Sequence, residues 1–298
     1  MNAAEQETAP VRRAGVDTLF AIGVALVALV VFLAAVGPGI APSDPTLASG
    51  GVNLPPPPLA EWPGLLAGAI FGTLETPVHW FGTDASGFDV FSRVIAAPRT
   101  DLTIALAANI LSLVLGVFLG LIAGYFRNGA TEFMMRLSDV LQSFPVFISA
   151  MILVALAGRS TFNIVLALSL LYTPIYIRLT RAEVMAQKTR GFVEAARAIG
   201  LTELQIALRH VLPNALTPAL IQSSVTIGFA ILLTAGLSFV GAGVRPPTPE
   251  WGLMISTGAN QIILGEWWPS VFPGIAISLT VFGFAILGNA LERRYEDA

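Results

Sequence analysis

Side chains that could carry out catalysis are few in this chain of 298 residues. It has no cysteine, which excludes thiolate nucleophiles, disulfides and cysteine-ligated metals. Its two histidines, His79 and His210, offer little material for a metal site or a Ser–His pair. The serines Ser112, Ser143 and Ser223 are conceivable nucleophiles of an intramembrane enzyme, but no plausible base accompanies them. We therefore predict no catalytic residue, no metal ligand and no cofactor in this chain; hydrolysis by the purified chain would support the enzyme alternative.

A second set of polar residues lies inside long uncharged segments and could contact a passing solute. Interhelical hydrogen bonding explains their presence equally well. Two members, Gln222 and Thr226, are one helical turn apart and share a face. The candidates for lining a pathway are Asn109, Gln142, Gln222, Ser223 and Thr226.

Composition places these residues in a membrane. Hydrophobic residues make up 55% of the chain and charged residues 12%, whereas soluble domains carry charge at about a quarter of their positions. The apolar residues form long uncharged blocks, and a helix needs about 20 such residues to cross the ~30 Å hydrocarbon layer. Pro145 and Pro174 lie inside two blocks, where neighbouring helices can satisfy the freed carbonyl groups. The six predicted spans are Thr18–Val36, Leu102–Phe126, Val140–Gly158, Ser160–Ile177, Leu216–Val240 and Trp267–Leu291.

The distribution of basic residues orients these spans. Lys and Arg are enriched in cytoplasmic loops, and with the N-terminus inside, only Arg93, Arg99, Arg159 and Arg245 of the sixteen fall outside. The first span could be a cleaved signal peptide, because basic residues precede it. Its uncharged stretch is longer than the apolar core of a signal peptide, which is about 7–15 residues, so we predict a retained helix. Both termini are then cytoplasmic. The predicted inner basic residues are Arg12, Arg13, Arg127, Arg136, Arg178, Arg181, Lys188, Arg190, Arg197, Arg209, Arg293 and Arg294.

The chain divides into tails, an outer loop and a helical core. The outer loop contains Pro55–Pro58 and scattered glycines, which favour irregular backbone over a packed domain and suggest a lid or docking surface. Trp62, Trp80, Trp267 and Trp268 fit an interfacial aromatic belt. The net charge of −3 argues against a nucleic-acid partner. The predicted divisions are a cytoplasmic tail 1–17, the first span 18–36, the extracytoplasmic loop 37–101, a core 102–291 with five further spans, and a cytoplasmic tail 292–298.

Three glycines in the second span predict close helix packing. Gly116, Gly120 and Gly124 are each four residues apart and therefore lie on one helical face. A face without side chains lets a second helix approach closely. We interpret it as a packing surface rather than a pore lining.

A long charged segment on the inner side, Arg178–Pro213, is larger than a helix hairpin needs. Its first predicted helix carries an apolar stripe at helical spacing and ends at Gly200, because glycine tolerates the left-handed conformation that closes a helix. Thr202 and Gln205 form a capping-box pattern that starts a second helix, with Pro213 near its end. The first, amphipathic helix could transmit a movement from a partner to the spans, or it could lie passively on lipid headgroups. The stripe consists of Phe192, Ala195, Ala196 and Ile199.

Several short motifs resemble those of one transporter family. Glu194-Ala195-Ala196, followed by Gly200 and Leu212-Pro213, resembles the EAA loop of ABC importer permeases, the element that docks into a cleft of the cytoplasmic ATPase. From about His79 onward the chain is similar to the dipeptide/oligopeptide/nickel permease family. One departure is Phe88, where family members commonly have arginine. The motifs that carry the similarity are His79–Asp84 with Gly87, Asp89 and Ser92-Arg93; Arg136–Asp139 with Phe144-Pro145; and Leu237–Gly241 with Pro246–Gly252.

This resemblance implies an all-α membrane protein with six transmembrane helices in the type I importer fold and a coupling segment at residues 190–213. It also implies a second homologous permease, two cytoplasmic ATPase subunits that bind ATP and Mg²⁺, an extracytoplasmic binding protein and a surrounding lipid bilayer. The chain has no G-x-x-x-x-G-K-[ST] phosphate loop of its own. Peptides are the expected substrate, with nickel chelates, glutathione or another small solute left open. The implied ATPase-docking residues are Glu194, Ala195, Ala196, Arg197, Gly200, Leu212 and Pro213.

Two other transport mechanisms are less consistent with the sequence. A secondary transporter usually needs an intramembrane carboxylate or histidine, whereas Asp101 and Asp139 lie at the ends of the predicted spans, where we expect solvated or interfacial charges. A channel would not need the long inner segment, and no filter motif is evident.

Overall fold

Residues 3–71, 78–126 and 128–296 are described by the computed structural model; the side chains of residues 3–17, 70 and 296 fall outside that description. The described chain is helical throughout except for loops and an isolated bridge between Thr83 and Asp89. The elements are α1 (Ala3–Ile40), η1 (Leu59–Glu61), α2 (Trp62–Phe71), α3 (Val90–Tyr125), α4 (Gly129–Gln142), α5 (Val146–Ala157), α6 (Thr161–Gln187), α7 (Gly191–Ala198), α8 (Glu203–Ile206), the π-helical turn η2 (Ala207–Val211), α9 (Leu212–Ala215), α10 (Thr217–Phe239), α11 (Trp251–Ala259), η3 (Ile262–Leu264) and α12 (Trp268–Glu296).

Within the described residues, five helices are long and apolar enough to cross a membrane: α1 from Thr18, α3, α6, α10 and α12. They correspond to five of the six predicted spans and extend several of them. Helix α1 already begins at Ala3 and α12 continues to Glu296, so both predicted tails are largely helical backbone. Residues 1–2, 297–298 and Arg127, and the side chains of Arg12 and Arg13, lie outside the described part of the chain.

The third predicted span, Val140–Gly158, is wrong as a single straight helix. Helices α4 and α5 take its place and meet at an angle of 93°. Proline lacks an N–H and disfavours helical backbone at the residue before it, and Pro145 is extended, with ψ at 123°. The helix therefore breaks at this residue, while Pro174 lies inside the continuous helix α6. If the bent pair is one span, the chain has six.

Helix α3 begins at Val90, so the predicted outer loop is shorter than residues 37–101. The carboxylate of Asp89 caps this helix by accepting the Ser92 N–H at 2.8 Å. The remaining loop contains η1 and α2 between stretches of irregular backbone, and it is pinned by backbone hydrogen bonds such as Thr83 N–H to Leu54 O at 2.9 Å. Trp268 is a buried residue whose indole donates to Thr83 O, so it is not an interfacial anchor.

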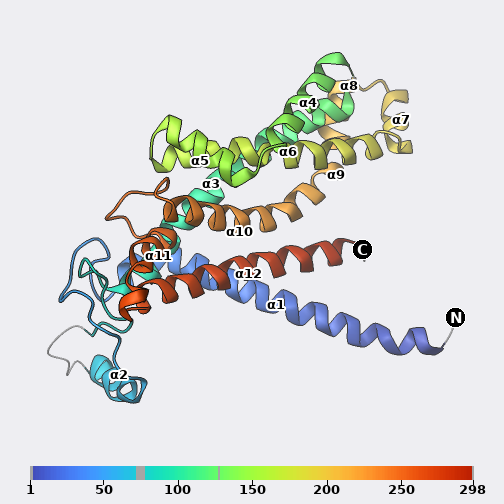
Figure 1. Ribbon diagram of the computed structural model, residues 1–298. Helices are drawn as coiled ribbons and strands as arrows, with labels where there is room; N and C mark the ends of the chain where they lie inside the picture. The colour runs from blue at the N-terminus through green and yellow to red at the C-terminus, as the bar shows by residue number, and fades with distance from the viewer. Residues whose placement is uncertain (1–2, 72–77, 127, 297–298) are drawn as a thin grey trace.

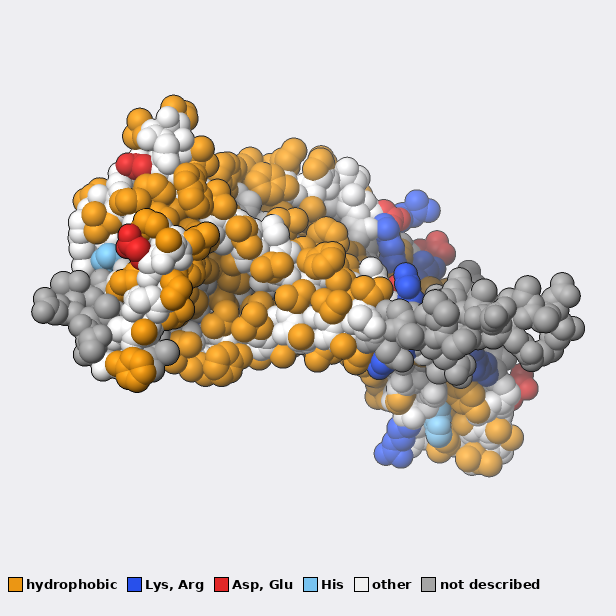
Figure 2. All heavy atoms as spheres, turned by 90° about the horizontal axis from the view of Figure 1, so that it is seen from below, with side chains coloured by type: hydrophobic (Ala, Val, Ile, Leu, Met, Phe, Trp, Pro, Cys, Tyr) orange, Lys and Arg blue, Asp and Glu red, His pale blue; other side chains and the backbone are white. Residues whose placement is uncertain are grey.

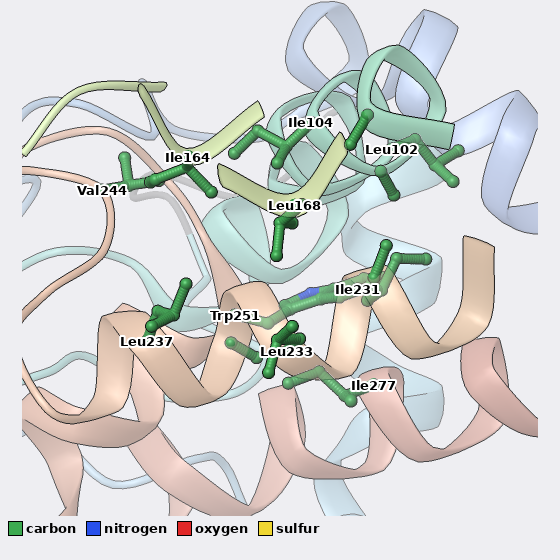
Figure 3. Packing of buried hydrophobic residues seen from close by; sticks show 14 of the residues in the cluster. Leu102, Ile104, Ile164, Leu168, Ile231, Leu233, Leu237, Val244, Trp251 and Ile277 are labelled. Atoms are coloured by element: carbon green, nitrogen blue, oxygen red, sulfur yellow. The ribbon is translucent and has the colours of Figure 1, made fainter. Parts of the chain in front are cut away.

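Short helices lie at the two ends of the bundle of long helices. Figure 1 shows α7 at the same end as the start of α1 and the end of α12, while α2 and α11 lie at the opposite end. Helix α1 packs against α3 and α12, and α10 packs between α3 and α12. Figure 3 shows Trp251, the first residue of α11, among Leu168, Ile231 and Leu233 of the main hydrophobic core.

The glycine face of α3 packs directly on α6, as the sequence predicted. A Cβ atom at Gly120 would lie 2.7 Å from Thr180 Cβ and 2.8 Å from the carbonyl oxygen of Ile177. One at Gly124 would lie 2.9 Å from the carbonyl oxygen of Arg181. These distances are shorter than real Cβ contacts, so α3 and α6 approach each other through backbone.

We expect Gly120→Ala to destabilise the chain, because the added methyl group must push α6 away; overpacking of this kind costs about 1–3 kcal/mol. Gly39→Ala is the matched control, since nothing lies within 4 Å of its Cβ position. Thermal unfolding of both variants in detergent measures the difference. Equal melting temperatures would contradict the close approach of α3 and α6.

Candidate functional site

Helix α7 and the segment after it form the candidate site. A short connection from α6 leads into α7, which has Glu194 in its first turn and Arg197 in its last. Acidic residues near a helix start and basic residues near its end favour the helix dipole. Gly200 follows at φ +85°, and the N–H of Leu201 donates to Ala196 O at 3.2 Å, which closes the helix as predicted.

The second helix starts with the predicted capping box. Gln205 N–H donates to Thr202 Oγ1, and Thr202 N–H donates to Gln205 Oε1, at 3.3 and 2.9 Å. Helices α8 and α9 continue through the π-helical turn η2, which precedes Pro213. Pro213 therefore lies inside this composite helix, and Asn214 Nδ2 donates to His210 O at 2.7 Å.

Helix α7 buries one face and exposes another. Val193 is fully buried and Ala196 nearly so, packed in a cluster with Val184, Ile206 and other apolar residues. Of the predicted apolar stripe, only Ala196 faces inward. Ile199 is 78% exposed, and Phe192 and Ala195 are exposed beside it.

The implied docking residues divide in the same way. Leu212 is partly buried and packs against two hydrophobic clusters, and Ala196 is buried as described above. The others present an accessible surface at the end of the molecule; they are Glu194, Ala195, Arg197, Gly200 and Pro213.

Polar contacts tie α7 to the transmembrane helices. Arg197 Nε and a terminal guanidinium nitrogen donate to the two oxygens of Glu203 at 2.7 and 3.1 Å. Glu203 also accepts a short hydrogen bond from the hydroxyl of Tyr125, the last residue of α3. The hydrogen bonds from Arg197 and Tyr125 lower the pKa of Glu203 to about 2, so this carboxylate stays ionised above that pH. Sequence reasoning missed Tyr125 and Glu203, because no local spacing relates them.

Most of the predicted pathway residues converge on one buried cluster. The hydroxyl of Tyr176 on α6 donates to Asn109 Oδ1 on α3 at 2.5 Å, and its oxygen lies within hydrogen-bond distance, 3.3 Å, of the hydroxyl of Ser223 on α10. Thr226 is buried on the same side of α10, and Gln222 Nε2 donates to its hydroxyl at 3.4 Å.

The remaining candidates differ in their access to solvent. Gln222 is partly exposed and lines a cavity of about 230 Å³ between α6, α10 and α12, together with Glu292 and Tyr295. Gln142 lies apart from these residues, at the end of α4. A larger cavity of about 390 Å³, lined by apolar residues such as Phe147 and Phe239, lies between α5, α10, α11 and α12.

The two carboxylates at the predicted span ends have different environments. Asp139 is exposed and pairs with Arg178 at 2.7 Å, as expected of an interfacial charge. Asp101 is only 2% exposed, and its carboxylate accepts the Trp251 N–H at 3.4 Å. The expectation of a solvated Asp101 is therefore wrong, because α11 folds back onto α3 and covers it.

At the end of the bundle opposite α7, Phe88 packs beneath Arg93, whose guanidinium carbon lies 4.5 Å from the ring centroid. Arg93 also donates to the carbonyl groups of Pro45 and Pro247 at 3.1 and 3.2 Å. In the described part of the chain, no three His, Asp or Glu side chains gather as a metal site.

Residues 116–297 match the family of binding-protein-dependent transport system inner membrane components, and the chain belongs to this family. Its fold is that of type I ABC importer permeases. A chain of the methionine ABC transporter MetNI in an inward-facing conformation aligns with a TM-score of 0.54 and 19% identity, over 68% of this chain and 95% of that one. A chain of an amino acid ABC transporter aligns with a TM-score of 0.50 and 18% identity, over 68% and 94%.

Curated relatives are more similar in sequence. The di/tripeptide transport system permease protein DppC of Pseudomonas aeruginosa is 37% identical over 270 residues, which cover 91% of this chain and 85% of that protein. The glutathione transport system permease protein GsiD of Pectobacterium atrosepticum is 35% identical over 214 residues, 72% of this chain and 71% of that protein. The relatives are transport permeases rather than enzymes, and this multi-pass chain is accordingly a component of a membrane transport complex.

We expect Gly200→Val to loosen the end of α7. Nothing lies within 4 Å of the Cβ position, so the cost comes from the left-handed backbone alone, about 1–2 kcal/mol. Gly191→Val is the control, because its Cβ position is equally open and its φ is not positive. Amide hydrogen exchange over residues 191–206 should accelerate in the first variant only; equal rates would show that Gly200 does not fix the end of the helix.

Proposed function

We propose that this chain is the permease subunit of an ATP-driven importer that takes up di- or oligopeptides. It forms the pathway with a second, homologous permease, receives substrate from an extracytoplasmic binding protein and docks through α7 onto one of two cytoplasmic ATPases. ATP and Mg²⁺ bind to those ATPases. The observation that carries this proposal is the exposed apolar face of α7, braced from behind by Val193 and Ala196.

This face is better explained by a protein partner than by lipid. Exposed apolar residues flanked by charged ones are typical of protein interaction sites, and Ile199 and Phe192 lie beside Glu194 and Arg197. A passive connector on headgroups would turn its apolar side toward the bilayer. Here the side that faces the bundle is occupied by Val193.

The orientation follows from charge. Figure 2 shows Lys and Arg side chains gathered at one end of the molecule, with a largely hydrophobic surface between the ends. The same end carries α7, the start of α1 and the end of α12. The positive-inside rule supports a cytoplasmic location for this end, and the proposal is therefore an inner-membrane protein with both termini inside.

The relatives support peptides as the substrate class. One is a di/tripeptide permease and another a glutathione permease; both names describe small peptidic solutes, and glutathione is the alternative substrate for this chain. Nickel chelates have less support. The larger cavity is lined by apolar and small residues, which suits solutes of varied side chains and leaves selectivity to the binding protein.

Among the five predicted pathway residues, Gln222 has the strongest support. It combines partial exposure with a position on a cavity near the inner end of α10. Asn109, Ser223 and Thr226 lie behind it as a hydrogen-bonded support that joins α3, α6 and α10.

We predict that Ile199→Asp weakens docking of the ATPase at least tenfold, about 1.4 kcal/mol, because a charge replaces an apolar contact at the centre of the interface. Ile263→Asp is the matched control, since Ile263 is 89% exposed at the opposite end. Co-purification of the ATPase with the permease pair measures docking. Equal ATPase recovery from both variants would contradict the assignment of α7 as the docking helix.

Uptake assays on the complete complex in proteoliposomes test whether ATP hydrolysis is coupled to transport through the segment 190–213. Glu194→Ala and Gly200→Asp should abolish or reduce substrate uptake while the two permeases remain assembled. If neither substitution changes uptake, the segment 190–213 is a passive surface connector and the coupling role is contradicted.

A third prediction uses the absence of cysteine from the chain. A charged, water-soluble maleimide should modify Gln222→Cys in the assembled complex, because this position opens to an aqueous pathway. Asn109→Cys should not react, since Asn109 is buried. If the maleimide modifies neither cysteine in any nucleotide state, Gln222 does not line an aqueous pathway.

A further inference from the structure

Besides sharing one hydrophobic cluster with Leu121 of α3 and Val184 of α6, helix α7 is joined to the membrane spans in two further ways. The covalent connection runs from Gln187 at the end of α6 to Gly191, and the residue that precedes α7, Arg190, makes no side-chain cap. A connection of this kind can bend at its backbone dihedral angles. The second connection is the chain of side-chain contacts from Arg197 through Glu203 to Tyr125.

This side-chain connection reaches a different helix. Tyr125 is the last residue of α3 and is 2% exposed, so its ring is fixed inside the protein. Lys188, which follows α6, donates from Nζ to the backbone oxygen of Tyr125 at 2.6 Å and lies 4.7 Å from the centre of its ring. The tyrosine therefore joins the inner ends of α3 and α6 to the turn between α7 and α8.

The two spans that meet at Tyr125, α3 and α6, are closely packed against each other. Gly116, Gly120 and Gly124 bring α3 against the backbone of α6 over a long contact. A displacement applied at Tyr125 is carried by this pair of helices. The Asn109–Tyr176–Ser223 hydrogen bonds extend the connection to α10.

We propose that Arg197, Glu203 and Tyr125 form a clasp that transmits the movement of α7 to the α3–α6 pair, with Tyr125 and Glu203 as positioning residues for transport. The proposal rests on the docking of α7 described above. Without the clasp, α7 remains docked and follows the ATPase, but its apolar packing and the covalent connection to α6 transmit only part of its displacement. ATP hydrolysis then continues with less substrate moved.

Tyr125→Phe tests the clasp with a minimal change. It removes one hydroxyl group and keeps the ring that packs against Lys188. The uptake rate per ATP hydrolysed should fall roughly fivefold or more in proteoliposomes of the full complex. The maximum rate of uptake should fall, the substrate concentration at half-maximal rate should stay unchanged, and ATPase recovery on purification should match the native complex.

Two comparisons separate the clasp from general damage. Tyr172→Phe changes another buried tyrosine of the spans and should leave the uptake per ATP unchanged. Glu203→Gln should reproduce the loss, and the double variant Tyr125→Phe, Glu203→Gln should be no worse than Glu203→Gln alone, because both changes interrupt one connection.

Two results would overturn the clasp. One is an unchanged ratio of uptake to ATP hydrolysis in both Tyr125→Phe and Glu203→Gln. The other is a loss of ATPase docking in proportion to uptake, which would make the contacts a support for folding. If the ATPase docks normally on the Ile199→Asp variant, the proposed docking function of α7 is itself contradicted. If Ile199→Asp loses docking but Tyr125→Phe keeps a normal ratio of uptake to ATP hydrolysis, only the clasp is contradicted.

Discussion

The backbone contact between α3 and α6 is the constraint on which the rest of the molecule depends. Inside lipid, apolar side chains gain little by leaving their surroundings, so helices associate through close packing and interhelical hydrogen bonds. The three glycines of α3 provide that packing, since no side chain separates Gly120 from the backbone of α6. The Asn109–Tyr176 hydrogen bond lies within the same contact.

Both ends of the molecule are organised by extensions of this pair. At the outer end, α3 continues beyond the membrane-spanning segment, where Arg99 donates to Ala34 O and Ala35 O at 3.2 and 3.0 Å and thereby holds the end of α1. At the inner end, Tyr125 and Lys188 project toward the segment that follows α7. One helix pair thus positions the loop that precedes α3 at one end of the molecule and α7, the proposed docking helix, at the other.

Sequence reasoning succeeded where the signal is local. Uncharged length revealed the spans, spacing identified the glycine face, and Gly200 with the Thr202 capping box marked the helix ends, because each signal lies within one short stretch of sequence. It failed where the deciding contact is distant. Tyr125 and Glu203 are 78 positions apart, and Asp101 is covered by Trp251, 150 positions away. The bend at Pro145 lies between these cases: its proline is visible in the sequence, but Pro174 shows that a proline alone does not decide whether a helix continues.

The apolar residues of α7 separate function from stability. Val193 and Ala196 pack the helix against its own chain, whereas Ile199, left 78% exposed, contributes little to that packing. A chain selected only for folding would gain solubility from a polar residue at such a position, because exposed apolar area promotes association. The same argument does not extend to the apolar surface of the spans, which lipid covers. Exposed apolar residues at the charged end of this molecule therefore point to a protein surface that covers them. Because Val193 and Ala196 hold α7 against the bundle, a partner bound to its exposed face would contact a firmly packed helix.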